Sequence, residues 1–311
     1  MQVLHLRSKG VAVLLRGITT RRASTKVIVP KALSPSPSAT SSTALLLEGR
    51  RATEDMVPVE AFAIAGVTFA GRQDLVRKLQ RDQIVYLERE PWNQYDLFAV
   101  RVLDLHGRVL GYIPRRDGQN ARFMYEGAFG LVASTGLVKD TAFYGARLYA
   151  RPKLASLLLD PLMLPGTAAT CLADLRVMFG ERWAPIRATT LAAANYRCEV
   201  TWVSQNHLPI EITPQWCYNA KEKAVQLTRL IALSKPVAAL KARLEQAIAE
   251  IADENDTTTA AALEALQATP DGQLFTELNG IAKEDVIQYF ELIRRRARTI
   301  QVDQWRIELL L

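Results

Sequence analysis

Cysteine and histidine are both scarce in this chain of 311 residues. Its three cysteines, Cys171, Cys198 and Cys217, have neither the CxxC spacing of a zinc site nor the number that a disulfide framework needs. Reduced thiols are typical of the cell interior, so we expect an intracellular protein. The three histidines lie far apart in the sequence, which disfavours a histidine-rich metal centre. We therefore expect no bound metal.

Long apolar runs and the common nucleotide-binding and hydrolase motifs are also absent. No stretch of 18 or more uncharged apolar residues occurs, so a membrane span and a membrane partner are not expected. The patterns GxxxxGKS, GxxxxGKT, GxGxxG and GxSxG are missing, and nucleotide hydrolysis, dinucleotide redox chemistry and serine hydrolysis lack their usual signatures. We accordingly expect no cofactor and no catalytic residue, and we favour a binding protein over an enzyme.

The composition is otherwise ordinary for a folded chain. Apolar residues make up 49% and charged residues 23% of the sequence, which is typical of globular proteins. A length of 311 residues corresponds to about two domains.

The positive charge is concentrated at the N-terminus. Residues 1–52 contain nine basic residues and the single acidic residue Glu48, a net charge of +8, whereas the whole chain carries +7. The rest of the chain is therefore close to neutral. Overall basicity is not evidence that the folded part binds nucleic acid.

The same segment is rich in Ser and Thr and includes a Pro/Ser run at 34–38, from which no core can be built. Three interpretations of residues 1–52 remain open: a solvated flexible tail, a transit peptide, and a basic arm that contacts phosphates. A transit peptide would place the protein in a mitochondrion or plastid. Otherwise the cytoplasm of a bacterium is expected.

Short apolar runs bounded by Gly, Asp and Pro begin at about Glu60, a pattern typical of strands joined by turns. Asp104-Leu105-His106-Gly107 is expected to turn between two strands, because Asp and Gly supply the backbone freedom of a hairpin. The expected strands cover 61–69, 84–87, 98–103, 109–113, 130–134 and 142–149, with a short helix over 73–79. They predict a mostly β domain over 53–152.

Prolines mark 153–190 as a connector with one short helix over 168–179, and a C-terminal unit follows over 191–311. Ser234 and Pro236 favour a helix start, and apolar residues from Val237 to Ile251 recur at helical spacing. Arginines 294, 295, 296 and 298 are expected to form a solvated face, with a phosphate-binding patch as the alternative. The unit is expected to hold helices over 191–198, 258–268 and 284–298 and strands over 210–216 and 224–233.

Three strings in the first unit resemble the HIRAN domain. They are Ala65 to Gln73, the core Arg89-Glu90-Pro91-Trp92-Asn93-Gln94-Tyr95-Asp96, and the hairpin from Gly107 through Gly111-Tyr112-Ile113-Pro114. The resemblance covers about residues 60–152 and implies a small β-barrel related to the OB fold. In the best-understood eukaryotic members this barrel binds single-stranded DNA and captures its free 3′ end. Gln94, Phe98 and Ala70 depart from the family pattern, which usually has proline, a small or amide residue, and a second aromatic at these positions.

The residues in these strings suit single-strand binding, because aromatic faces stack on bases and cations follow the phosphates. An acceptor such as Asp96 or Asn93 would distinguish a 3′-hydroxyl from an internal phosphodiester. In a purely structural alternative, Asn93 to Asp96 form a tight Asx turn and the aromatics belong to the core. The expected nucleic-acid contacts are Phe69, Arg72, Arg89, Asn93, Tyr95, Asp96, Tyr112, Arg115 and Arg116.

A second resemblance covers about residues 191–245. The strings 196–201, 208–218 and 227–233 resemble a bacterial HNH endonuclease-like module. Of the family's zinc ligands and catalytic groups Cys198 alone remains, since Thr201, Thr213, Ser234, Val237 and Ala238 stand at the other positions. One cysteine cannot hold zinc, and an HNH nuclease without its histidine lacks a general base. The resemblance implies a degenerate, metal-free module.

The expected fold class is α+β: a small OB-like barrel, a mixed hairpin-helix module and C-terminal helices. The leading hypothesis is a non-enzymatic adaptor that binds single-stranded DNA or DNA 3′ ends, with a role in DNA repair. One alternative is an HNH-type nuclease. The other is a structural or assembly protein that contacts a protein partner through its C-terminal helices and the apolar end Trp305 to Leu311.

Overall fold

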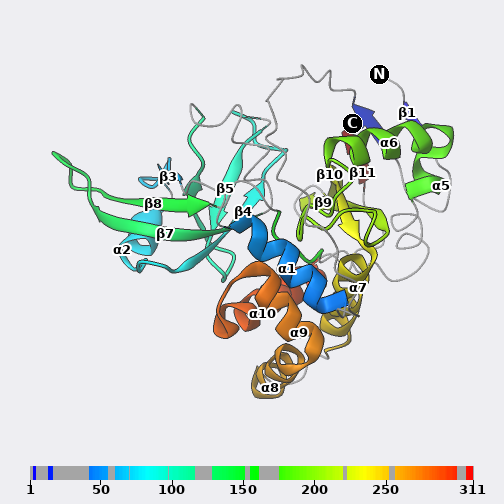
Figure 1. Cartoon of the computed structure of the whole chain (residues 1–311). Coiled ribbons are helices and arrows are strands. Elements are labelled where there is room, and N and C mark those ends of the chain that lie inside the picture. The colour runs from blue at the N-terminus through cyan, green and yellow to red at the C-terminus, as the bar shows by residue number, and fades with distance from the viewer. Residues whose placement is uncertain are drawn as a thin grey trace.

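Two β-sheets and a group of helices make up the mixed α+β fold, with α1, α9 and α10 lying along one side (Figure 1). The computed structural model describes residues 3–4, 13–16, 42–54, 60–69, 71–96, 98–115, 128–150, 155–160, 175–219, 223–251, 256–299 and 306–310.

The first sheet is a curled, six-stranded antiparallel sheet in the order β3-β8-β7-β4-β5-β6. Its strands are β3 (Glu60–Ala63), β4 (Ile84–Arg89), β5 (Val100–Leu103), β6 (Val109–Tyr112), β7 (Ala128–Leu137) and β8 (Tyr144–Ala150). The short helix α2 (Arg72–Arg77) follows β3. Each expected strand of this unit is present, although the first one ends at Ala63 instead of Phe69.

The two edges of this sheet meet just beyond β3. Ala65 and Tyr112 form an antiparallel bridge in which each backbone N–H donates to the other's carbonyl, at 2.8 and 2.9 Å. Gly111 makes the approach feasible, because a Cβ at this position would lie 2.4 Å from both the Ala65 carbonyl oxygen and the Ile64 Cγ2. The bridge therefore closes the curl at its two edges, as a barrel requires.

Strand β4 is buried on both faces. Val85 and Leu87 belong to the core inside the curled sheet, whereas Ile84 and Tyr86 belong to a second core shared with the helices. This division follows from the two-residue side-chain period of a strand. One strand therefore serves two cores, and its outward face holds the barrel against the rest of the molecule.

The second sheet has the order β1-β2-β11-β10-β9. Its strands are β1 (Val3–Leu4), β2 (Val13–Arg16), β9 (Ile210–Asn219), β10 (Ala224–Ser234) and β11 (Arg306–Leu310). The antiparallel hairpin β9–β10 leads directly into α7 (Lys235–Glu250), with Ser234 at the N-cap position and proline in the first turn. This is the expected hairpin-helix module, and Val237, Leu240, Leu244 and Ile248 are buried on α7.

The remaining helices are α1 (Ser42–Glu54), α5 (Leu175–Phe179), the 3-10 turn η1 (Gly180–Arg182), α6 (Trp183–Ala193), α8 (Asp256–Ala268), α9 (Pro270–Asn279) and α10 (Lys283–Thr299). Tyr86 and Phe129 of the first sheet meet Tyr289 of α10, with ring centroids 4.9 to 6.1 Å apart. Phe275 of α9 stacks on Tyr289 at 5.9 Å. This aromatic cluster forms the centre of the second core.

Several expectations differ from the structure. Residues 42–54 form helix α1, and Leu46 is 1% exposed. Most of this helix belongs to the segment 1–52, for which a flexible tail, a transit peptide and a basic arm were the open interpretations. Arg50 is buried too, and its Nη1 donates to the carbonyls of Val200 and Ala155 at 2.8 and 3.1 Å. Long-range packing therefore outweighs the tail-like composition of this segment.

The helix expected at 191–198 lies earlier, at Trp183–Ala193, because Pro185 is tolerated within its first turn. Helix α9 was not expected, although Thr269 and Pro270 are a favourable N-cap and first residue. The start of the helix expected over 168–179 lies outside the described residues, which show helix from Leu175.

The apolar faces of the C-terminal helices point inward. Among the described residues, the large hydrophobic side chains with high exposure are Phe69, Tyr95, Leu137, Val138, Phe143 and Tyr196, and none of them lies on α7 to α10. Whether a protein partner binds these helices stays a prediction from the sequence. No helix in the described ranges has the length and hydropathy needed to span a bilayer.

Candidate nucleic-acid interface

The loop after β4 is an Asx turn built around Asn93. The Asn93 Oδ1 accepts hydrogen bonds from the backbone N–H groups of Tyr95 and Asp96 at 3.0 and 3.1 Å. Its Nδ2 donates to Glu90 Oε2 at 2.6 Å, and Asp96 Oδ1 accepts from the Phe98 N–H at 3.0 Å. Asn93 therefore forms the Asx turn that the structural alternative predicted. The side chains of Asn93 and Asp96 both bind backbone N–H groups of the loop that carries Tyr95.

Tyr95 is not a core aromatic. Its side chain is 83% exposed at the tip of this loop, the highest exposed fraction among the large hydrophobic residues described. Its ring face is open to solvent and available for stacking.

The second loop presents Phe69, which is 67% exposed. Gly66 and Gly71 on either side have φ of 70°, a left-handed conformation that favours glycine. The Arg72 Nη1 donates to the Gly66 carbonyl at 2.9 Å, and the Arg72 N–H donates to the Phe69 carbonyl at 3.1 Å. These bonds hold the turn so that the phenyl ring projects outward.

Tyr112, Arg72 and Glu90 join the two loops. The Arg72 guanidinium lies over the Tyr112 ring, 5.2 Å from its centroid. Burial, then the carboxylate of Glu90 and its hydrogen bond, raise the pKa of Tyr112, so the phenol remains protonated. Glu90 in turn accepts from Asn93. The chain of contacts from Arg72 through Tyr112 and Glu90 to Asn93 brings Phe69 and Tyr95 to the same end of the barrel.

The arginines at the expected site differ from one another. Arg115 is exposed, but Arg89 is 8% exposed and its guanidinium lies 5.3 Å from the centroid of the Phe98 ring. Arg89 is therefore largely buried, and its contact with nucleic acid stays a prediction from the sequence. Arg116 lies outside the described residues.

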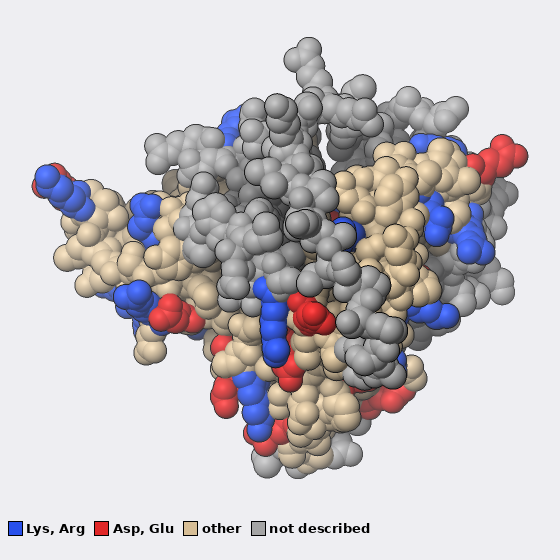
Figure 2. All heavy atoms as spheres, in the orientation of Figure 1, with Lys and Arg blue, Asp and Glu red and all other residues tan. Residues whose placement is uncertain are grey.

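Lys and Arg do not gather into one continuous patch on the described surface seen in Figure 2, where they are interspersed with Asp and Glu. This distribution agrees with the near-neutral charge of the chain beyond its N-terminal segment. Contacts of nucleic acid with the described surface would therefore depend on stacking and local hydrogen bonds more than on a broad electrostatic field.

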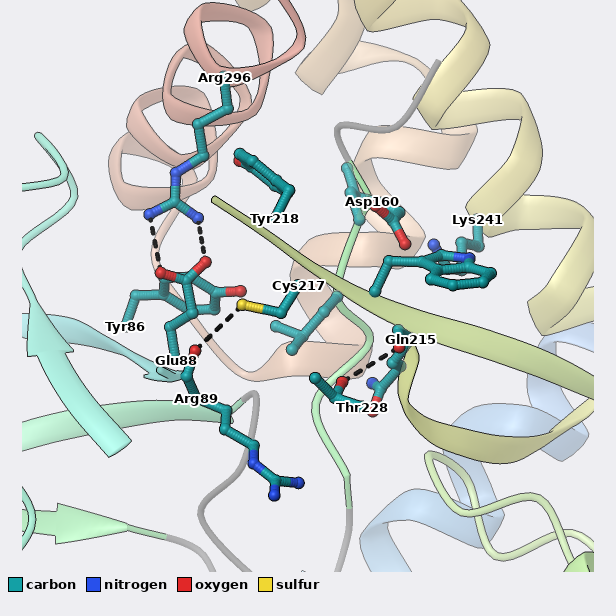
Figure 3. A pocket seen from close by; sticks show the side chains of 13 residues that line it. Tyr86, Glu88, Arg89, Asp160, Gln215, Cys217, Tyr218, Thr228, Lys241 and Arg296 are labelled. Atoms are coloured by element: carbon teal, nitrogen blue, oxygen red, sulfur yellow. Dashed lines mark hydrogen bonds and ion pairs between the residues drawn. The ribbon is translucent and has the colours of Figure 1, made fainter. Parts of the chain in front are cut away.

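A buried ion cluster lies between the first sheet and α10, and the sequence analysis missed it. Glu88 accepts from Arg101 on the neighbouring strand at 2.8 and 2.5 Å. It also accepts from Arg296 on α10 at 2.8 Å (Figure 3). Burial alone would raise the pKa of Glu88, but the two guanidinium groups lower it below its usual value. The expectation that the α10 arginines form a solvated face is wrong for Arg296 and for Arg294, which is 6% exposed.

The Glu88–Arg101 part of this cluster had a sequence signal, since both residues interrupt apolar strands with opposite charges, and the strands pair with Glu88 facing Arg101. Arg296, which lies 208 positions from Glu88 in the chain, had none.

Several positions of the hairpin-helix module that were compared with HNH ligands are buried. Cys198, Thr201, Ser234 and Val237, four of the positions compared with HNH ligands, are each 0% exposed. The described part of the chain holds no group of three His, Cys, Asp or Glu side chains that could bind a metal ion. The relationship to HNH modules remains a prediction from the sequence.

Comparisons with known proteins address the first sheet. The crystal structure of a protein from Lactobacillus plantarum is 22% identical over 30% of this chain and 95% of its own, with a TM-score of 0.25. The crystal structure of the HIRAN domain of human HLTF is 17% identical over 30% of this chain and 74% of its own, with a TM-score of 0.23. TM-scores this low establish no likeness over the whole fold, and no curated protein matches the chain.

A family model gives the clearer result. It matches residues 61–128, which include both loops of the interface, the strands β4 to β6 and the bridge between Ala65 and Tyr112. The matched segment is 68 of the 311 residues. Residues 61–128 of this chain are therefore a HIRAN domain.

Proposed function

We propose that the protein is a non-enzymatic adaptor that binds single-stranded DNA at its 3′ end through the HIRAN domain. The observation that carries this proposal is the pair of exposed rings, Phe69 and Tyr95, on two loops that are joined through Tyr112 and Glu90. The match to the HIRAN domain supports DNA as the ligand, because HIRAN domains bind DNA 3′ ends.

The two rings act as stacking platforms. Each aromatic face that stacks on a base contributes about 1–3 kcal/mol, and the interaction tolerates any base because every base has a π-face. Sequence-independent binding is therefore expected, with the basic residues of the N-terminal segment adding phosphate contacts that weaken as salt rises.

Asp96 supplies end recognition. A carboxylate at the loop tip accepts a hydrogen bond from a terminal 3′-hydroxyl and repels a terminal 3′-phosphate, which carries negative charge. An internal phosphodiester has no proton to donate. The same side chain holds the Phe98 N–H, so its position is set by the loop itself.

Fluorescence anisotropy with the full-length chain tests the proposal. The probes are a labelled single strand that ends in a 3′-hydroxyl and the same strand that ends in a 3′-phosphate. We expect tighter binding of the 3′-hydroxyl strand. Equal affinity for both strands would contradict end recognition, and no binding to either would overturn the function.

Tyr95→Ala is the decisive variant. Loss of one stacking face is expected to weaken binding by about 1–3 kcal/mol, roughly 5- to 150-fold in Kd, without unfolding the protein, because Tyr95 is exposed. Tyr196→Ala is the matched control, since Tyr196 is a 47% exposed tyrosine in the hairpin-helix module. Asp96→Asn keeps the oxygen that accepts from Phe98 and removes the charge, so it should reduce the preference for the 3′-hydroxyl. An unchanged preference would show that Asp96 does not contact the end.

A further inference from the structure

A cavity of about 310 Å³ lies where the HIRAN domain meets the hairpin-helix module. Its volume is in the range of small-molecule sites. Its lining comes from the end of β4 and the following loop, from β5 and from β9: Arg89, Glu90, Trp92, Arg101, Cys217, Tyr218 and Asn219. A smaller cavity of about 50 Å³, drawn in Figure 3, adjoins it, because Arg89, Cys217 and Tyr218 line both.

Two buried donors of this lining have no partner in the described structure. The Trp92 Nε1–H and the Tyr218 hydroxyl are both shielded from solvent, and neither makes a hydrogen bond. A buried donor without a partner costs about 1–3 kcal/mol, and such groups in a folded protein call for an explanation. Both residues belong to the lining of the cavity.

Tyr218 is a donor at any physiological pH. Burial raises the pKa of its hydroxyl well above the usual value, and the carboxylate of Glu88 adds to the effect against the opposing charge of Arg296. Figure 3 shows its ring beside Arg296 and Cys217. The indole of Trp92 is a donor only.

The charged groups of the lining also favour an anion. Arg89 and Arg101 contribute two guanidinium groups, of which that of Arg101 also pairs with Glu88, and Glu90 is the one carboxylate among the seven lining residues. Glu90 is already engaged by Asn93 and by Tyr112, and it lies 3.7 Å from Arg101. Guanidinium groups bind planar and tetrahedral oxyanions with charge-assisted hydrogen bonds.

We propose that this cavity binds a phosphate group, with Trp92 and Tyr218 donating hydrogen bonds and the arginines supplying positive charge. The phosphate belongs either to the end of a nucleic-acid strand or to a small phosphorylated molecule. The site is distinct from the Phe69–Tyr95 surface and needs the hairpin-helix module, because Cys217, Tyr218 and Asn219 come from β9.

Titration of the full-length chain with inorganic phosphate tests the site. The melting temperature in phosphate-free buffer should rise with added phosphate, as expected for a ligand that binds the folded state, and calorimetry should give a saturable isotherm. Sodium chloride at matched ionic strength is the control. A melting temperature that responds equally to phosphate and to chloride would overturn the proposal.

Tyr218→Phe and Trp92→Phe each remove one donor and keep an aromatic ring. Either change should weaken phosphate binding about tenfold, which corresponds to roughly 1.4 kcal/mol. Tyr218→Phe should not lower the melting temperature without phosphate, because it removes a buried hydroxyl that lacks a partner. Tyr196→Phe and Trp183→Phe are matched controls outside the lining. Wild-type phosphate affinity in both test variants would contradict the site.

Two further measurements are needed. One distinguishes a strand end from a small molecule as the source of the phosphate, and the other distinguishes the cavity from the Phe69–Tyr95 surface. If the ligand is a strand end, a single strand with a 5′-phosphate should bind more tightly than one with a 5′-hydroxyl, and Tyr218→Phe should abolish the difference. If it is a small molecule, inorganic phosphate should bind while the two strands bind alike. Tyr95→Ala should leave the phosphate titration unchanged, so failure of the stacking surface can be told from failure of the cavity.

Discussion

Glu88 shows how much one side chain contributes to the contact between the first sheet and α10. It is 8% exposed and is held by Arg101 of the adjacent strand and by Arg296 of α10. Removing one partner of a buried ion pair is costly, because the remaining charges stay buried without compensation. A neutral residue at position 88 would remove this carboxylate from both Arg101 and Arg296.

The first prediction at this scale is that Glu88→Gln lowers the free energy of unfolding at pH 7 by about 3 kcal/mol, measured from urea denaturation. The matched control is Asp271→Asn, because Asp271 pairs with Arg243 at the surface, where that arginine's side chain is 56% exposed. A surface pair contributes about 1 kcal/mol or less. Equal losses of unfolding free energy in the two variants would show that the buried Glu88 pairs stabilise the protein no more than a surface pair does.

The same residue predicts a pH dependence. The pKa of folded Glu88 is lowered, so its contribution is fully present above the unfolded pKa of about 4.3 and is lost as the pH falls through the lower folded value. The stability difference between wild type and Glu88→Gln should therefore shrink as the pH falls below about 4.3. A difference that stays constant down to acid pH would mean that folding does not lower the pKa of Glu88.

At the scale of the element, the closure of the barrel depends on a single glycine. Gly111→Ala would place a Cβ 2.4 Å from the Ala65 carbonyl oxygen, so the bridge between Ala65 and Tyr112 would have to open. We expect a loss of about 1–3 kcal/mol in the free energy of unfolding, the range for overpacked sites. DNA binding should fall as well, because Tyr112 joins the two loops.

Gly136→Ala is the control for this change. Gly136 lies on β7, and a Cβ there would meet no atom within 4 Å. Replacing a strand glycine with alanine in open space should be neutral or slightly stabilising. If both glycine variants lose the same stability, the effect belongs to glycine itself and not to the closure of the barrel.

Local patterns predicted the strands of the first sheet, because β4 to β8 follow short apolar runs between turn residues. Phe69 and Tyr95 were also named from the sequence, and both are exposed. Helix α9 was missed despite the N-cap at Thr269. The surroundings of Arg89 and Arg296 could not be predicted, because packing between distant segments decides whether an arginine reaches solvent.

At the scale of the whole molecule, β4 joins two cores. Tyr86 on its outer face is 7% exposed only because α10 covers it, and Phe129 of β7 packs on the same helix through Tyr289. The Cys217 Sγ of β9 also donates to the Arg89 carbonyl at 3.1 Å. The barrel is therefore held by contacts from both the helices and the hairpin-helix module.

This arrangement predicts that a fragment of residues 53–152 is much less stable than the full chain. Without α10 it exposes the rings of Tyr86 and Phe129 and leaves Glu88 without Arg296. Each buried aromatic side chain that returns to water costs about 1.5–3 kcal/mol, and the loss from two rings is a large part of the 5–15 kcal/mol that stabilises a typical domain. Thermal unfolding of fragment and full chain, with single-strand binding measured on both, is the test. A fragment that melts at the same temperature as the full chain would show that the HIRAN domain is autonomous and that the contacts with α10 only position it.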